Sequence, residues 1–382
     1  MMNKRIWLSS PHMGGTEILY VKNAFDTNWV APLGPNVDQF ELDLENYLGE
    51  KCKVAALNSG TSALHMSLIL LGVKEGDEVL CQSLTFAASA NPILYQGATP
   101  IFIDSEMETW NISPDILENA IKDRIKNGKL PKAIIIVHLY GMPAQMDRLI
   151  QISKKYKIPL IEDAAEALGS KYKNRRLGTF GDLGIISFNG NKIITTSGGG
   201  AIISTNSDFI TKAKFLSSQA KEPAPYFQHT KIGYNYRMSN ICAGIGRGQM
   251  EVLSLRVFQR RRNFQYYKRL LSGFNTIKFQ EEPNSDYMSN RWLTAIIIND
   301  DNIKKEDLRL YLEKQNIEVR HIWKPMHLQP VFANYPFYGD GTSENLFNKG
   351  VCLPSGSNLN NLQLNRVIKE IRKAIELSLI AQ

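Results

Sequence analysis

Between about residues 50 and 205, short apolar runs alternate with segments of helical periodicity, and this alternation constrains the fold most strongly. Strands that are buried on both faces of a parallel sheet read as short, continuous apolar runs. Seven such runs predict strands, at 53–57, 78–82, 99–103, 133–137, 159–161, 185–188 and 201–204. The repeated strand–helix units therefore predict an α/β fold, with a seven-stranded, mostly parallel sheet that is covered by helices on both faces.

Helical patterns fill the intervals between these runs. We expect helices at 61–71, 87–96 and 145–156, and another that begins at Ser113-Pro114. Serine is favoured as the N-cap of a helix and proline at its first position, so this pair marks a helix start.

The character of the chain changes after about residue 206. A long helical tract at 249–271 precedes a strand-like segment at 292–298, and further helices are expected at 305–314 and 361–379. These elements predict a smaller α+β domain. We expect a large domain that includes the N-terminal segment at 1–250 and a small C-terminal domain at 251–382. No low-complexity linker separates them, so tight packing is expected.

Composition excludes several classes of protein. No apolar run approaches the roughly 18–20 residues of a membrane span, and no secretory apolar core follows the N-terminus, so we expect a cytoplasmic protein. The four cysteines form no CxxC pair and the six histidines lack metal-ligand spacing, which argues against a disulfide framework or a metal site.

The formal net charge of +8 has two interpretations. One is a soluble protein from a lysine-rich proteome, and the other is a basic cleft for an anionic, phosphate-bearing substrate. The run Arg260-Arg261-Arg262 lies in a segment of helical pattern, so we expect a solvated helix face there rather than a nucleic-acid site.

An acidic residue ends one of the predicted strands. Asp163 follows the apolar run of 158–161, and Glu166 comes three residues later. Ligands of parallel α/β sheets bind beyond the carboxyl ends of the strands, where an acid can pair with a cationic ring nitrogen. A structural cap is the alternative for Asp163.

Lys192 follows another predicted strand and precedes the glycines of 198–200. Its neighbours are apolar, amide and hydroxyl residues rather than charges. A lysine in such surroundings can be desolvated and reactive toward carbonyl compounds. The alternatives are an ordinary loop lysine and a nucleotide-binding P-loop, but the glycine and lysine spacing of a P-loop is absent.

A third polar turn lies at Ser59-Gly60-Thr61-Ser62, between a predicted strand and a predicted helix. Free backbone N–H groups and hydroxyls at a helix N-terminus can bind a phosphate. Plain N-capping by Ser59 or Thr61 is the alternative.

The order and spacing of these segments resemble the DegT/DnrJ/EryC1/StrS family of sugar aminotransferases, a branch of the fold type I enzymes that use pyridoxal 5′-phosphate (PLP). The stretches 85–86, 178–182 and 233–240 agree with this resemblance, which covers nearly the whole chain. Four further stretches resemble the enzymes that form UDP-bacillosamine precursors by amination at C4. They are residues 9–14, 28–36, 323–327 and 189–200.

The resemblance implies a role for individual residues. Lys192 would bind PLP covalently and move a proton between the substrate carbon and the cofactor carbon. Asp163 would pair with the pyridine nitrogen, Glu166 would lie near the ring hydroxyl, and Phe86 would stack on the ring. The implied cofactor site is Gly60, Thr61, Ser62, Phe86, Asp163, Glu166, Ser187, Lys192 and, from the neighbouring subunit, Asn235. The implied substrate site is Asn28, Trp29, Val30, Ala31, Ser59, Glu166, Arg237, Lys324 and His327.

The resemblance also implies the reaction. L-Glutamate would donate an amino group, and a UDP-linked 4-keto-6-deoxy-N-acetylhexosamine would accept it at C4, for the synthesis of surface glycans. The enzyme would be a homodimer with shared active sites. Three alternatives stay open: a TDP- or GDP-linked 3- or 4-keto deoxysugar as the acceptor, a dehydratase of the same fold, in which histidine replaces the lysine, and a non-catalytic regulatory or scaffold protein.

Overall fold

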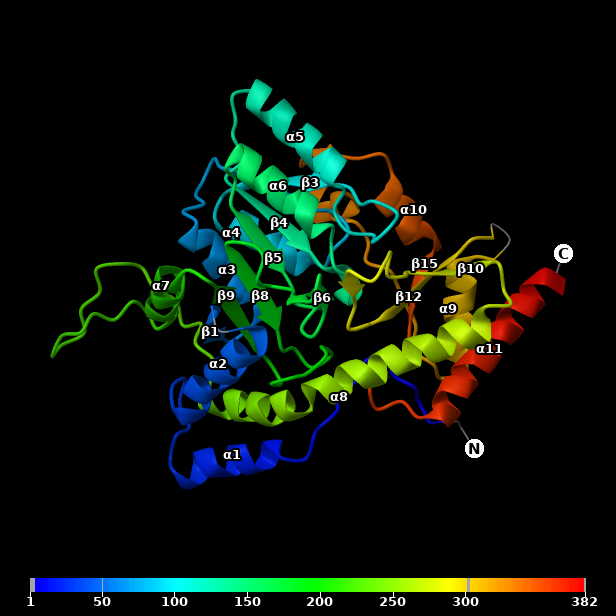
Figure 1. Ribbon diagram of the computed structural model, residues 1–382, viewed down its shortest axis with the longest axis horizontal. Helices are drawn as coiled ribbons and strands as arrows, with labels where there is room; N and C mark the ends of the chain where they lie inside the picture. Colours follow the sequence, from blue (N-terminus) through cyan, green and yellow to red (C-terminus); the bar gives the residue numbers. More distant parts are fainter. Residues whose placement is uncertain (1–3, 50, 301–302, 381–382) are drawn as a thin grey trace.

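The computed structural model describes residues 4–49, 51–300 and 303–380. Its largest sheet has eight strands in the order β1-β9-β8-β5-β4-β2-β3-β14 (Figure 1). Their bounds, in that order, are Lys53–Leu57, Gly200–Ser204, Leu183–Ser187, Leu160–Asp163, Ala133–Val137, Glu78–Gln82, Thr99–Ile103 and Phe337–Tyr338. Strand β9 is antiparallel to β1 and β8, and the other pairs are parallel. The mostly parallel sheet is confirmed.

All seven predicted strands are present, but the sheet has eight strands rather than the predicted seven. The eighth strand, β14, has two residues and comes from the C-terminal part of the chain to pair with β3. So short a strand carries no periodicity of its own, and its place depends on a contact between segments far apart in the sequence.

Helices cover both faces of the large sheet, as the apolar runs predicted. Ile135 of β4 packs in a buried cluster with α3 (Gly60–Leu70) and α7 (Ser207–Ser217). Its neighbours Ile134 and Ile136 point the other way, into a cluster with α5 (Pro114–Lys126) and α6 (Met146–Tyr156). Successive residues of a strand alternate between faces, so an all-apolar strand needs cover on both sides.

Of two helices predicted between the strands of this sheet, one begins where expected and the other is interrupted. Helix α5 begins as expected, because Pro114 is its first residue and the Ser113 hydroxyl accepts a hydrogen bond from the N–H of Ile116. The single helix expected at 87–96 is wrong: a 3-10 turn (Ala87–Ser89) and α4 (Asn91–Tyr95) take its place. Pro92 has no N–H to donate to the preceding turn, which interrupts the helical hydrogen bonding.

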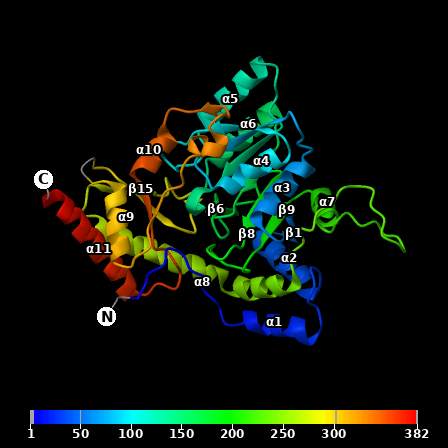
Figure 2. The same ribbon diagram turned by 180° about the vertical axis from the view of Figure 1, so that it is seen from behind.

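A second, antiparallel sheet lies toward the other end of the molecule. It has the order β10-β12-β15-β13, with bounds Ile277–Phe279, Thr294–Ile298, Gly350–Leu353 and Arg320–His321. Helices α9 (Lys305–Lys314) and α11 (Asn361–Ile380) pack against it. In Figure 2, this sheet and α11 lie at the opposite end of the molecule from α7.

Helix α8 (Asn240–Leu271) extends from the large sheet to the small one (Figure 1). It begins nine residues before the expected start at residue 249, after the Ser239 N-cap, and it runs without a break past residue 250. Near the N-terminus, Ile6 forms a bridge with Ile317, which precedes β13. The division into domains at residue 250 therefore stays a prediction.

The remaining elements are short or peripheral. Their bounds are α1 Glu17–Asp26, α2 Pro35–Leu48, β6 Lys171–Tyr172, β7 Arg175–Arg176, β11 Tyr287–Met288 and α10 Thr342–Lys349, with further 3-10 turns at Leu139–Gly141, Met326–Leu328 and Pro330–Phe332. Within the described part of the chain, no helix is both long and apolar enough to span a bilayer.

The expectation of a solvated arginine face at 260–262 is wrong for Arg260. Its side chain is buried on α8 and donates to the carbonyl oxygen of Trp292 at 2.5 Å and to the hydroxyl of Ser9 at 2.9 Å. Burial lowers the pKa of this guanidinium to about 9. The reason is that Arg260 lies on the side of α8 that faces Trp292 and the N-terminal segment, so protein encloses its guanidinium. Arg262, two residues on, is exposed as expected.

Candidate active site

A cavity of about 320 Å³ lies at the carboxyl ends of β4, β5 and β8. The cavity therefore lies where the sequence predicted a ligand crevice, beyond the carboxyl ends of these strands. The cavity is lined, among others, by Ser59, Gly60, Thr61, Phe86, Ser89, Asp163, Glu166, Ser187, Lys192, Trp292 and Trp323. Most of the cofactor residues implied by the sequence therefore meet in one place.

Lys192 lies in the loop between β8 and β9, and its amine is enclosed. Its Nζ lies 3.6 Å from Glu166 Oε1 and 4.2 Å from the centre of the Trp292 ring. The Trp292 indole N–H donates to the carbonyl oxygen of Asn191 at 2.8 Å, which fixes the loop beside the lysine. A cation is stabilised both by a carboxylate and by the face of an aromatic ring.

Asp163 is the last residue of β5, and its side chain is buried. One carboxylate oxygen accepts a hydrogen bond from the Ser89 hydroxyl at 2.6 Å, and the other accepts one from the N–H of Ala165 at 3.1 Å. Burial raises the pKa of Asp163, while Ser89, Ala165 and the charge of Lys192 oppose this rise. A cationic ligand in the cavity would stabilise the ionised form further.

Glu166 lies in the same crevice, as the sequence predicted. Its Oε2 accepts a hydrogen bond from the N–H of Tyr140 at 2.7 Å, which leaves Oε1 facing Lys192. Burial raises the pKa of this carboxyl group, and the charge of Lys192 is the main opposing influence. Tyr140 has a φ of 56°, which turns its N–H toward the glutamate.

The predicted phosphate turn forms the end of the cavity at the start of α3. A Cβ on Gly60 would lie 2.9 Å from the Cβ of Ser187, so this close approach of α3 to the end of β8 requires glycine. Thr61 and Ser187 line the cavity. Ser62 is not among its lining residues: its hydroxyl donates to Asn58 Oδ1 at 2.6 Å, inside the cap of the helix.

Phe86 and Trp323 form the aromatic part of the wall. Phe86 is 54% exposed, and its ring centre lies 5.4 Å from that of Trp323. A large apolar ring that is exposed inside a cavity is available to stack on a planar ligand.

Two of the predicted residues on the segment before α8 lie away from this cavity. Asn235 is exposed, and its carbonyl oxygen accepts from the Asn58 side chain at 3.2 Å. Arg237 donates to Glu41 Oε1 at 2.7 Å and to the carbonyl oxygen of Ala56 at 3.0 Å. Neither lines the cavity of its own chain.

The stretch Asn28, Trp29, Val30 and Ala31 also lies elsewhere, in the connection between α1 and α2. Asn240, at the start of α8, donates from its side chain to the carbonyl oxygen of Trp29 and from its backbone to that of Ala31. Trp29 and Val30 are 40% and 52% exposed. Trp29 and Ala31 are thus held through their carbonyl oxygens, while the side chains of Trp29 and Val30 are exposed.

A second cavity, of about 700 Å³, adjoins the first and shares with it Asn191, Trp292 and Trp323. Lys324 lines it, together with Arg309 and Arg320. The predicted substrate residue His327 does not line either cavity. Its ring stacks on Phe337 and contacts Ser83 Oγ at 2.7 Å, which connects the segment before β14 to the large sheet.

Sequence reasoning missed several residues of the site. Ser89, Trp292 and Trp323 line the cavity, and Tyr140 holds Glu166 through its backbone N–H; each comes from a different segment. In the sequence, Ser89 is indicated only by its position close to the 85–86 stretch. Trp323 is indicated only because it is the first residue of the 323–327 stretch. Trp292 precedes a strand of the small sheet, so no local pattern connects it with Lys192.

Comparison with known proteins agrees with this geometry. The model of the DegT/DnrJ/EryC1/StrS aminotransferase family matches residues 11–372. The chain belongs to this family. It is therefore a PLP-dependent aminotransferase with the fold type I architecture, as the sequence resemblance implied.

Three relatives illustrate the range of the family. EpsN of Bacillus subtilis, assigned as a pyridoxal phosphate-dependent aminotransferase, is 51% identical over 96% of this chain and 95% of its own length. GDP-perosamine synthase of Escherichia coli O157:H7 is 35% identical over 97% and 98%. UDP-4-amino-4,6-dideoxy-N-acetyl-β-L-altrosamine transaminase of Campylobacter jejuni is 36% identical over 77% of both chains.

A solved structure has the same architecture. The DegT/DnrJ/EryC1/StrS aminotransferase of Brucella abortus is 29% identical, with a TM-score of 0.87 over 94% of this chain and 95% of its own. The residues around the cavity fit PLP. Lys192 offers an amine, Asp163 a buried acid, Phe86 a ring face, and the Gly60 turn a helix N-terminus for the phosphate.

Proposed function

We propose that this aminotransferase transfers the amino group of L-glutamate to C4 of a UDP-linked 4-keto-6-deoxy-N-acetylhexosamine. The observation that carries the proposal is the pair of adjoining cavities, one holding Lys192 and Asp163 and the other lined by Lys324, Arg309 and Arg320. A planar cofactor and a bulky anionic sugar nucleotide need adjacent but separate spaces. The Campylobacter relative supports the choice, since its name describes a UDP-linked, N-acetylated, 6-deoxy sugar with an amino group at C4.

PLP, when bound, supplies an electron sink that makes the adjacent C–H bond acidic. The side chains do the rest. Asp163 would hold a positive charge at the ring nitrogen, because its carboxylate lines the cavity and accepts a hydrogen bond from Ser89 that favours its ionised form. Lys192 moves a proton at the substrate carbon, and Glu166 stabilises the lysine when it is protonated. Trp292 and Trp323 exclude water from one wall.

L-Glutamate suits a site that is rich in cations. The second cavity has three cationic side chains, but two of them are paired: Arg309 with Glu306 and Arg320 with Glu318. Lys324 is therefore our candidate for contact with a carboxylate of the donor or a phosphate of the acceptor.

A second candidate acceptor is a GDP-linked 4-keto deoxysugar. It is favoured by the Escherichia coli relative, whose match covers 97% of the chain. The retention of Lys192 argues against the dehydratase alternative, which lacks the lysine. A cytoplasmic location and a role in surface glycans stay predictions.

The acceptor can be identified directly. The PLP enzyme is mixed with L-glutamate and, separately, with UDP-, GDP- and TDP-linked 4-keto-6-deoxy sugars, and products are read by mass spectrometry. We expect the amino product from the UDP-linked N-acetylated sugar with the highest kcat/KM. Amination of the GDP-linked sugar alone would exclude the UDP-linked acceptor and support the second candidate. Amination of TDP-linked sugars alone would exclude both candidate acceptors.

We also propose that the enzyme is a homodimer with shared active sites. The segment between α7 and α8 extends away from the body of the molecule (Figure 1). It carries Phe227 and Ile232, which are 84% and 86% exposed, and it ends near Asn235. Such apolar exposure is typical of a surface that a second subunit covers. Light scattering should give twice the mass of one chain, and a monomer with full activity would exclude shared sites.

A further inference from the structure

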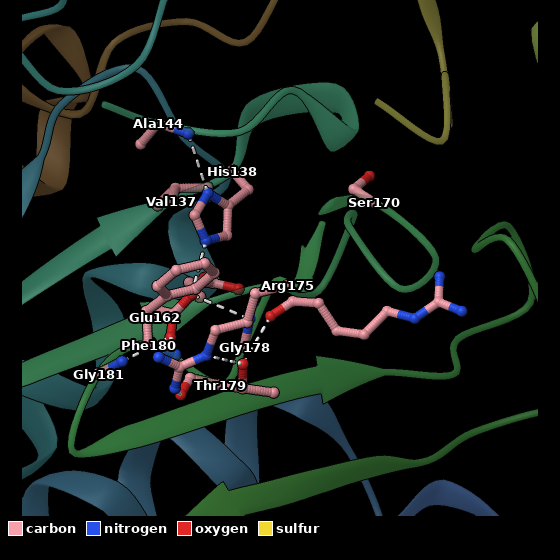
Figure 3. A network of polar contacts seen from close by, with 12 residues as sticks. Val137, His138, Ala144, Glu162, Ser170, Arg175, Gly178, Thr179, Phe180 and Gly181 are labelled. Carbon is pink, nitrogen blue, oxygen red and sulfur yellow. Dashed lines mark hydrogen bonds and ion pairs between the residues drawn. The ribbon is translucent and has the colours of Figure 1, made fainter. Parts of the chain in front are cut away.

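Glu162 directly precedes Asp163 on β5, and the two acids point to opposite faces of the strand. Asp163 lines the cavity, whereas Glu162 is 0% exposed and faces the turn at 178–181. Figure 3 shows Glu162 between that turn and His138, which follows β4. A buried carboxylate needs donors around it, since burial without them is costly.

Four donors surround the carboxylate of Glu162. The N–H of Gly178 and the ring Nε2 of His138 lie 2.9 and 3.0 Å from Oε2. The N–H groups of Phe180 and Gly181 lie 2.5 and 2.7 Å from Oε1. This residue therefore fixes the turn before β8 to the end of β5, directly behind the side chain that faces the cofactor.

The ring of His138 is held in one tautomer. Its Nδ1 faces the backbone N–H of Ala144 at 3.2 Å, and a backbone N–H can only donate. The ring hydrogen must then be on Nε2, where it is donated to Glu162. The backbone N–H of His138 in addition donates to the carbonyl oxygen of Asp163 at 3.2 Å. One residue thus contacts Glu162 through its ring and Asp163 through its backbone.

We propose that His138 and Glu162 form a positioning pair for Asp163, an inference that rests on the proposed role of Asp163 at the ring nitrogen. Neither residue touches the cofactor. Together they fix the ends of β4 and β5 and the 178–181 turn, and so hold the Asp163 carboxylate in the direction of the ring. An ion pair between Asp163 and a cationic ring nitrogen needs both groups held within about 0.5 Å of the productive geometry. Loss of the support from His138 and Glu162 therefore weakens that ion pair.

Two isosteric variants separate the contacts of His138. In His138→Asn, the amide oxygen takes the place of Nδ1 and keeps the contact with Ala144, but the donor to Glu162 is lost. In His138→Gln, the amide nitrogen takes the place of Nε2 and restores that donor. The matched control is His65→Asn, because His65 is also buried and its ring contacts Tyr236 and Gln96, away from β4 and β5.

The measurements are the dissociation constant of PLP, by absorbance titration of the cofactor-free protein, and the thermal midpoint of each variant without PLP. We expect His138→Asn to raise the dissociation constant about tenfold, as the loss of one hydrogen bond to a charged group does. His138→Gln should recover most of the affinity, including when His138→Asn folds poorly. His65→Asn should lower the thermal midpoint comparably but leave the dissociation constant within about twofold.

Equal weakening of PLP binding in His138→Asn and His65→Asn would overturn the proposal, since a general loss of stability would then explain both. So would a wild-type dissociation constant in His138→Asn. Asp163→Asn, measured in parallel, separates this inference from the proposed function. If Asp163→Asn binds PLP like the wild type, the role of Asp163 fails and the inference fails with it. If Asp163→Asn weakens binding and His138→Asn does not, the inference alone fails.

Discussion

The amine of Lys192 lies 3.6 Å from Glu166 Oε1 and is enclosed on another side by the ring of Trp292. This arrangement places a carboxylate and an aromatic ring face beside the lysine amine inside the cavity. The carboxylate is itself held by the N–H of Tyr140, so its position does not depend on the lysine. Lys192 can therefore leave and return to its ion pair while the acid stays in place.

Replacing Lys192 tests the centre of the site. We expect Lys192→Ala to lose the visible absorbance of lysine-bound PLP and to lower turnover by on the order of 10²–10⁴-fold, because the group that we propose to move the proton is gone. Spectrophotometry and a coupled assay for 2-oxoglutarate measure both effects. Lys126→Ala, at the exposed end of α5, is the control and should behave as wild type. Wild-type turnover in Lys192→Ala would contradict the assignment.

Ser89 influences the ionisation of Asp163. Its hydroxyl donates to Asp163 at 2.6 Å and opposes the rise in the pKa of Asp163 that burial causes. Without this donor the pKa of Asp163 rises further, so the carboxylate is lost at a higher pH. We therefore expect the acidic limb of the pH profile of kcat/KM to move upward in Ser89→Ala, with near-normal activity on the plateau above it.

The control for this profile is Ser67→Ala. Ser67 is also a buried serine, and its hydroxyl donates to the carbonyl oxygen of Ala63 within α3. Its removal should leave the acidic limb in place. A limb that moves in both variants, or in neither, would show that Ser89 does not control the ionisation of Asp163.

Arg260 links three segments near Lys192. Its guanidinium donates to the carbonyl oxygen of Trp292 and the hydroxyl of Ser9, and lies 3.5 Å from the carbonyl oxygen of Lys192. Lysine keeps the charge but lacks the forked set of donors. We expect Arg260→Lys to lower the free energy of unfolding by about 1–3 kcal/mol, since a buried acceptor loses its donor.

Urea denaturation measures this loss, and Arg269→Lys is the control. Arg269 lies on the exposed side of the same helix, so its replacement should change the free energy of unfolding by no more than about 0.5 kcal/mol. Equal stability of the two variants would mean that the buried contacts of Arg260 contribute little.

The large sheet could be predicted because each of its seven longer strands contains a continuous apolar run. The first turns of α8 could not, because Gly244, Gly246 and Gly248 have low helix propensity. The structure explains them: a Cβ on Gly246 would lie 2.7 Å from the Phe40 ring, and one on Gly248 would lie 2.8 Å from the N of Glu17. Close packing of α1 and α2 on α8 overrides the propensity.

The residues of the site likewise include some that the sequence predicts and others that it does not. Lys192, Asp163 and the Gly60 turn each belong to a local pattern of strand, turn and helix, so the sequence revealed them. Ser89 and Trp292 act only through contacts with residues far away in the chain. No periodicity or short motif records such contacts, and only the folded arrangement shows them.

Gly60 permits a close approach between α3 and β8 in the predicted phosphate site. A Cβ there would lie 2.9 Å from the Cβ of Ser187, so alanine must push the start of α3 away from the end of β8. We expect Gly60→Ala to raise the dissociation constant of PLP about tenfold, in line with the roughly 1–3 kcal/mol that overpacking costs. Pyridoxal, which lacks the phosphate, should bind the variant and the wild type with similar affinity.

The comparison of the two ligands decides whether the effect belongs to the phosphate. Gly190→Ala is the matched control, because the nearest atom to a Cβ there is 4.0 Å away, on Pro11, and its φ is outside the left-handed range. It should bind both ligands like the wild type. If Gly60→Ala weakened PLP and pyridoxal equally, the glycine would maintain the general shape of the cavity, and the phosphate would have to be held elsewhere than at the start of α3.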